Sequence, residues 1–142
     1  MIGNDIALLG LLRLVSPALP VGGFAYSQGL ETAIDKGWVE DAPHTHAWLS
    51  GVMSCGLANL DIPLLCRLYD AVDDIDKFAH WNQYALACRE TLELRKEEQQ
   101  MGKALWRLLK GTGCGLPEIT SPTWLAAFAF AAKNWGLDKR QT

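Results

Sequence analysis

A chain of 142 residues, of which 49% are hydrophobic, is long enough to bury a core as a single domain. The net charge is −3 and the chain has no basic run, so it lacks the positive surface charge expected of a protein that binds nucleic acid or an anionic membrane. Six tryptophans are many for a small domain and indicate a partner surface, because tryptophan is enriched at protein interfaces.

The first predicted helix begins at Asn4 or Asp5, either of which can cap it, and continues to Val15. The following Ser16-Pro17 step ends it, because the residue before proline disfavours the helical conformation. Asp5 and Arg13 argue against a secretory signal, which needs a basic flank and an uninterrupted apolar centre. No segment approaches the ~18 to 20 apolar residues that cross a bilayer, so we expect a soluble, cytoplasmic protein without membrane contact.

The next predicted feature is a rigid loop over residues 17–23, rich in proline and glycine, followed by a short helix. Ser27 is placed to cap this second helix, which runs to about Lys36. Gly37 then stands where a helix commonly ends, since glycine readily adopts positive φ.

A third predicted helix begins after Asp41, a favourable N-cap, with Pro43 in its first turn. Pro63 should kink or end this helix, because proline lacks the N–H that an interior helical position donates. The apolar run of residues 64–72 continues as another helix.

The longest periodic stretch has two apolar stripes at helical spacing, over residues 78–92 and 94–108. Six polar residues in a row, Arg95 to Gln100, lie within it and cannot all face a core. Either one long helix projects into solvent there, or two helices meet near Thr91. The sequence leaves both arrangements open.

The last predicted helix follows a flexible loop at residues 111–115, with Ser121 as its N-cap and Pro122 in its first position. Between Trp124 and Trp135 it is apolar on nearly every side, so other protein must cover it. We expect a further segment, a second copy or another subunit to do so.

Residues that start and stop helices recur along the chain, and strand signals are almost absent, which predicts an all-α fold. We expect a single-domain helical bundle of about six or seven helices without a sheet, over residues 1–142. The four cysteines form no C-x-x-C pair, which removes the main support for a zinc or thioredoxin-type site. We therefore interpret them as reduced thiols in the core.

The string of residues 25–29 differs at one position from the G-x-S-x-G nucleophile elbow of α/β-hydrolases. In a serine hydrolase built on Ser27, His80 would act as the base and Asp61 would orient it. The elbow needs a strand before it, and here a proline- and glycine-rich loop precedes it. Hydrolase activity therefore stays an alternative, and we predict that the protein is not an enzyme.

Metal and nucleotide sites have little support. His44 and His46 stand two positions apart, so on a helix they point in different directions, and nothing nearby completes a ligand set. The glycines at 111–115 lack the Lys-Ser/Thr of a phosphate-binding loop. We predict no catalytic residue, no metal ligand and no permanently bound cofactor.

The segment from Arg89 to Arg95 alternates in charge sign, and Arg89 could pair with Glu93 at helical spacing. On periodicity alone this segment is a solvated helix face.

Three strings together resemble the family of urease accessory proteins called UreF, in order and spacing as well as in residues. The resemblance runs through most of the chain. The strings are LVSPALPVGGFAYSQGLE at residues 14–31, DIPL at residues 61–64, and RETLELR at residues 89–95 followed by Gly102.

The resemblance implies a helical, dimeric, non-catalytic scaffold. Such a protein binds a second accessory protein, UreD (also called UreH), and with it recruits the GTPase UreG to apo-urease for nickel insertion. Nickel would be handled by the complex without a permanent site in this chain. Family members normally continue for several further helices, so we expect that this sequence is the amino-terminal and central part of such a protein.

The proline-stiffened loop and its flanks suit a recognition element, because a restricted backbone lowers the cost of ordering an interface. The competing interpretation is that the loop only turns the chain and that Phe24 plugs the core. A generic helical interaction module is a third hypothesis for the whole protein. The predicted partner-binding residues are Pro20, Gly22, Gly23, Phe24, Tyr26, Ser27, Gln28, Gly29, Glu31, Arg89, Glu93 and Arg95.

Overall fold

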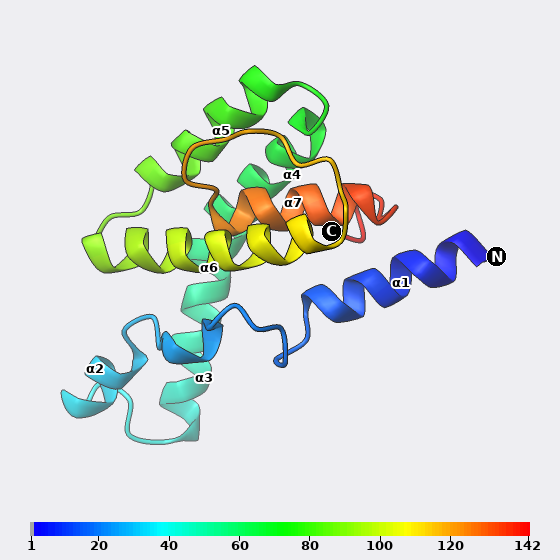
Figure 1. Cartoon of the computed structure of the whole chain (residues 1–142). Coiled ribbons are helices and arrows are strands. Elements are labelled where there is room, and N and C mark those ends of the chain that lie inside the picture. Colours follow the sequence, from blue (N-terminus) through cyan, green and yellow to red (C-terminus); the bar gives the residue numbers. More distant parts are fainter. Residues whose placement is uncertain (1) are drawn as a thin grey trace.

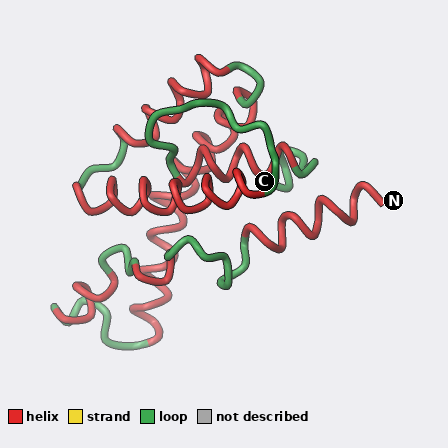
Figure 2. Tube along the Cα trace, viewed as in Figure 1, coloured by secondary structure: helices red, strands yellow, loops and turns green. Residues whose placement is uncertain are grey.

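The computed structural model describes residues 2–142, with side chains from Asp5 onward, and within them it contains helices and no strand (Figures 1 and 2). The all-α prediction is therefore confirmed. The helices are α1 (Ile2–Leu14), the 3-10 turn η1 (Gly23–Ala25), α2 (Leu30–Asp35), α3 (Ala42–Gly51), the π-helix η2 (Val52–Asp61), α4 (Ile62–Ala71), α5 (Ile75–Ala87), α6 (Leu92–Gly111) and α7 (Trp124–Asn134).

Helix α7 lies at the centre of the body, where α4, α5, α6 and α1 pack around it (Figure 1). Its buried face carries Leu125, Phe130 and a series of alanines, and small side chains allow neighbouring helices to approach closely. Our expectation that another segment or subunit must cover α7 was wrong, because the described chain itself supplies the cover.

The start of α7 also differs from the prediction. Thr123, and not Ser121, is the N-cap, and its hydroxyl accepts a hydrogen bond of 3.1 Å from the N–H of Ala126. Ser121 has a φ of 51°, a left-handed conformation that is uncommon outside glycine. The chain therefore turns at Ser121 before the helix begins at Trp124.

Helices α3, η2 and α4 run on as one helix from Ala42 to Ala71, so Pro63 does not end it. The π-helix immediately before Pro63 has a wider turn, which changes the hydrogen-bonding register where proline has no N–H to donate. By length and composition alone this helix could cross a membrane, which corrects our statement that no segment approaches that length. Core helices of soluble proteins pass the same test but are mostly buried, whereas only 6% of the most apolar window of this helix is buried.

Two predicted helix starts were wrong, and two predicted boundaries were confirmed. Helix α1 begins at Ile2, before the predicted caps, and the N-cap of α2 is Gly29 in place of Ser27. Asp41 does cap α3, since its carboxylate accepts a hydrogen bond of 2.9 Å from the N–H of His44. Gly37 follows α2 with a φ of 69°, as a helix-ending glycine does.

The polar stretch inside the longest periodic segment belongs to α6, and two helices meet before it. Thr91 caps α6, with its hydroxyl accepting from the N–H of Leu94 at 3.2 Å. Of the two arrangements that the sequence left open, the structure has the one in which two helices meet near Thr91.

The cysteines are less buried than expected. All four cysteines are free, and none is fully buried, with Cys55 exposed, so they are not core thiols. None of the six tryptophans is fully buried either, and Trp38 is 61% exposed.

Candidate partner-binding site

The loop of residues 17–29 lies along the amino-terminal half of α6 and is joined to it by two side-chain hydrogen bonds. The hydroxyl of Tyr26 donates to Oε1 of Gln100 at 2.8 Å. Nε2 of Gln28 donates to Oε1 of Glu97 at 3.2 Å. The two bonds reach α6 one helical turn apart, and together they hold the loop against this helix.

Phe24 projects from this loop into solvent, with 95% of its surface exposed. It belongs to η1, which begins after Gly22 in the left-handed conformation at a φ of 79°. The neighbouring Gly23 faces Met101 on α6, whose methyl group would lie 3.2 Å from a Cβ at that position. The interpretation that Phe24 plugs the core was therefore wrong: the loop presents this ring outward.

The other predicted residues of the loop lie on or near the surface. Pro20 and Glu31 are exposed, and Gly29 has a φ of 87° at the start of α2, which favours glycine. Ser27 is half-buried and its side chain makes no hydrogen bond among those of the described residues. Within residues 2–142 no strand precedes Ser27, so the structural context of a nucleophile elbow is absent.

Arg89 lies in the turn between α5 and α6, where it forms a buried ion-pair triad. Its Nη1 is 2.8 Å from Oδ1 of Asp61, and its Nη2 is 2.9 Å from Oε2 of Glu98. The three side chains are only 14%, 18% and 8% exposed respectively. The predicted pairing of Arg89 with Glu93 was wrong, because Arg89 precedes the helix and points inward.

Burial and charge act in opposite directions in this triad. Burial disfavours the charged guanidinium, but the carboxylates of Glu98 and Asp61 outweigh it, so the pKa of Arg89 is raised. Burial also raises the pKa of Glu98 above its ordinary value, against the opposing attraction of Arg89 and a backbone hydrogen bond. Glu98 thus carries a desolvation cost that its partners offset only in part.

The triad also connects to α7, because the second oxygen of Glu98 accepts a hydrogen bond of 3.1 Å from the N–H of Leu125. This N–H lies in the first turn of α7, where backbone donors have no partner within the helix. Arg95 adds a further hydrogen bond, since its Nε donates to the carbonyl of Arg89 at 2.9 Å. Glu93, the remaining predicted residue of this segment, is exposed. The triad therefore joins η2, the α5–α6 turn, α6 and α7.

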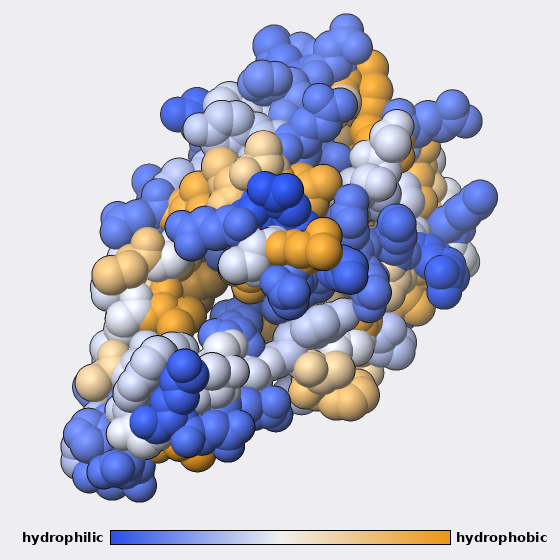
Figure 3. All heavy atoms as spheres, turned by 90° about the vertical axis from the view of Figure 1, so that its left-hand side faces the viewer, coloured by the Kyte–Doolittle hydropathy of each residue, from blue (hydrophilic) through white to orange (hydrophobic). Residues whose placement is uncertain are grey.

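Beside the triad, an open groove separates α6 from the projecting arm formed by α2, α3 and η2 (Figure 3). Its arm side is apolar, with Trp48, Val52 and Gly56, and its body side carries Arg89 and Leu94. The predicted loop residues and the segment from Arg89 to Arg95 thus border the same groove.

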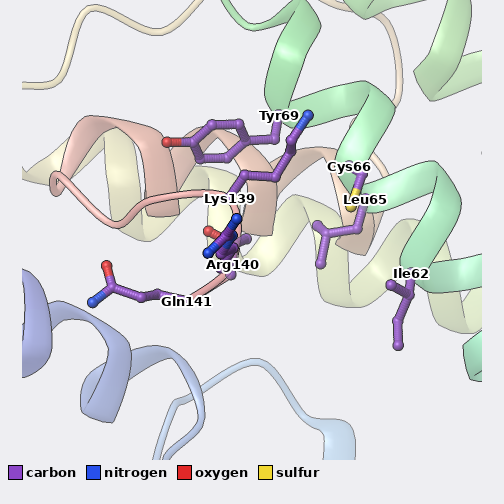
Figure 4. A pocket seen from close by; sticks show the side chains of 8 residues that line it. Ile62, Leu65, Cys66, Tyr69, Lys139, Arg140 and Gln141 are labelled. Carbon is purple, nitrogen blue, oxygen red and sulfur yellow. The ribbon is translucent and has the colours of Figure 1, made fainter.

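A smaller hollow of about 290 Å³ lies between α4 and the carboxyl-terminal residues (Figure 4). Two of its polar groups are already engaged: the hydroxyl of Tyr69 donates to the carbonyl of Leu137 at 2.6 Å, and Lys139 lies 2.7 Å from Asp70. No cluster of three or more potential metal ligands occurs in the part of the chain that the structure describes.

Comparison with known proteins decides the family. The model of the family described as UreF matches residues 39–142. The chain belongs to the UreF family. The urease accessory protein UreF of Pseudomonas putida (strain W619) is 50% identical over 144 residues, which cover 97% of this chain and 64% of that protein. The protein of the same name from Marinobacter nauticus is 46% identical over 146 residues, which cover 99% of this chain and 63% of that protein.

This chain thus spans less than two thirds of the length of these UreF relatives. The three strings that carried the resemblance are separated in sequence and meet in space. The loop of the first lies on α6, and Asp61 of the second pairs with Arg89 of the third.

Two structural residues of this UreF chain, Glu98 and Asn82, escaped the sequence analysis. Glu98 stood in a polar run that resembled a solvated face. Asn82 is buried on α5, where Nδ2 donates to the carbonyls of Thr120 and Ser121 and Oδ1 accepts from the N–H of Thr123 at 2.8 Å. The only sequence signal for either was a polar residue at a position of an apolar stripe.

Proposed function

We propose that this chain is a non-catalytic scaffold in urease maturation, which acts with UreD (UreH) to recruit the GTPase UreG to apo-urease. The observation that carries the proposal is the outward-facing Phe24 on a loop fixed to α6 through Tyr26 and Gln28. A large exposed aromatic ring on a preorganised backbone is typical of an interface anchor. Membership of the UreF family supports the urease-maturation context.

The proposal includes a cytoplasmic homodimer that handles nickel only as cargo of the assembled complex. Nickel would pass to urease without a permanent ligand set in this chain, and GTP hydrolysis would belong to the partner. The names of the relatives as accessory proteins support a role beside the enzyme and not as the enzyme.

The direct test is capture of purified UreG and UreD by the immobilised chain. We expect Phe24→Ala to weaken the capture of UreG by about tenfold or more, as truncation of an aromatic anchor does. Ser27→Ala should weaken it less, because this side chain is only half-buried in the groove wall.

The matched control is Ile75→Ala, an exposed apolar side chain at the start of α5 on the body. Circular dichroism should show the same helix content for all three variants. If Phe24→Ala and Ile75→Ala capture UreG equally well, the loop is not the binding surface.

A further inference from the structure

The arm contains a helical segment without a single charged residue. Between Asp41 and Asp61 the sequence has no Asp, Glu, Lys or Arg. Leu49, Met53 and Leu57 repeat every four residues along it and are 50%, 62% and 41% exposed. Soluble proteins seldom expose such a continuous apolar row without a partner for it.

The adjoining side of the same segment is apolar as well, and Leu57 of the exposed row borders the groove on that side. Trp48 and Val52 line the groove toward α6, so the segment is apolar around most of its circumference. A helix of this kind is normally buried on all sides. In this chain only 6% of the most apolar window of the Ala42–Ala71 helix is buried.

Two glycines make room for close packing against this segment. A Cβ placed on Gly51 or Gly56 would meet no atom within 4 Å beyond its own helix backbone and its neighbours in the chain. Small residues let another backbone approach closely, so the surface is shaped for a helix and not only for a loose chain. The absence of charge between Asp41 and Asp61 makes an apolar helix the matching occupant.

The length of UreF relatives indicates where such a helix comes from. About a third of the Pseudomonas putida (strain W619) protein lies outside its match to this chain. We propose that Leu49, Met53 and Leu57 form the docking surface for an apolar helix supplied by that remaining third of a UreF chain. This inference depends on family membership and not on the proposed binding of UreG.

The test uses the remaining third of the strain W619 protein as a separate polypeptide, coexpressed with this 142-residue chain. We expect the two to copurify in a 1:1 ratio. Met53→Glu and Leu49→Glu should each reduce copurification at least tenfold, because each places a charge in an apolar contact. Both side chains are exposed, so neither change should alter the fold.

Ile75→Glu is the control, since it places the same charge on an exposed apolar residue of α5. It should leave copurification unchanged. A second measurement does not depend on the isolated piece: in the intact strain W619 protein, amides matching residues 48–60 should exchange with solvent slowly. Fast exchange there, or copurification that Met53→Glu does not reduce, overturns the inference.

Two other occupants give different results. If the chain alone sediments as a dimer that Met53→Glu converts to a monomer, the surface belongs to a second copy. If the chain binds phosphatidylglycerol vesicles and Met53→Glu releases it, the surface belongs to a membrane. Either result refutes docking by the remaining third, and neither changes the expected effect of Phe24→Ala on the capture of UreG.

Discussion

Nη2 of Arg89 lies 2.9 Å from Oε2 of Glu98, so the turn before α6 is tied to a buried position on the helix itself. The same guanidinium reaches Asp61 at the end of η2, and Glu98 reaches the first turn of α7. One arginine therefore forms ion pairs with two carboxylates from separate helices.

Arg89→Met should lower the free energy of unfolding by about 3 kcal/mol, because it leaves two buried carboxylates without a cation. Urea denaturation followed by circular dichroism measures the change. Arg107→Met is the matched control, since Arg107 is exposed on α6 and forms no ion pair among the described residues; it should change stability by less than about 0.5 kcal/mol. Equal stabilities of the two variants would show that the triad does not hold the helices together.

The raised pKa of Glu98 predicts a pH dependence of stability. Because the pKa in the folded state exceeds the ordinary value of 4.5, the contribution of this group is fully present below about pH 4.5 and is lost as the pH rises through the raised pKa. Glu98→Gln cannot titrate there and keeps an oxygen for the N–H of Leu125. The stability of the wild type relative to Glu98→Gln should fall as the pH rises above about 4.5. Parallel pH profiles of the two proteins would contradict the assignment.

Gly102 is required where α6 crosses the start of α7. A Cβ at this position would lie 2.7 Å from the carbonyl oxygen of Thr123 and closer still to that of Pro122, so the backbone would have to move. We expect Gly102→Ala to cost about 2 kcal/mol or more of unfolding free energy, as overpacking does.

Gly111, at the end of the same helix, has open space around it and is the matched control. Gly111→Ala should leave stability unchanged or raise it by up to about 1 kcal/mol, because alanine has the higher helix propensity. Thermal unfolding of both variants measures the difference. A smaller loss for Gly102→Ala than for Gly111→Ala would refute the close crossing.

Asn82 fixes the loop that leads into α7. Asn82→Ala removes one acceptor and two donor contacts and leaves buried backbone groups unpaired, so it should cost about 2 to 3 kcal/mol. The exposed neighbour Gln83 provides the control, since Gln83→Ala should be nearly neutral. Amide exchange should also accelerate at Thr123 in Asn82→Ala and stay unchanged in Gln83→Ala.

Much of the helical order could be read from local signals. Asp41 caps a helix and Gly37 ends one, as predicted, and Thr91 caps α6 at the place where one of the two open arrangements put a helix boundary. Such signals act within a single turn, so neighbouring residues suffice to recognise them. At Ser27 and Ser121 the same reasoning failed, because the chain turns through positive φ before each helix begins, at Gln28 and Gly29 in the first case and at Ser121 itself in the second.

The candidate site shows where local reasoning ends. The exposed loop with Phe24 followed from its prolines and glycines, and from a resemblance that the family comparison confirmed. The role of Arg89 did not follow, since helical spacing suggested a partner four residues away and the actual partners are distant in sequence.

The sequence by itself determined the helical class, some helix boundaries and the family, because capping, periodicity and motif spacing are properties of neighbouring residues. Only the tertiary structure decided that Glu98 and Asn82 are buried, that α7 is covered from within the chain and that the arm is not. Burial depends on which helices meet, and that is set by the packing of the whole chain. A polar residue on a helix therefore reveals its role only when the surface opposite it is known.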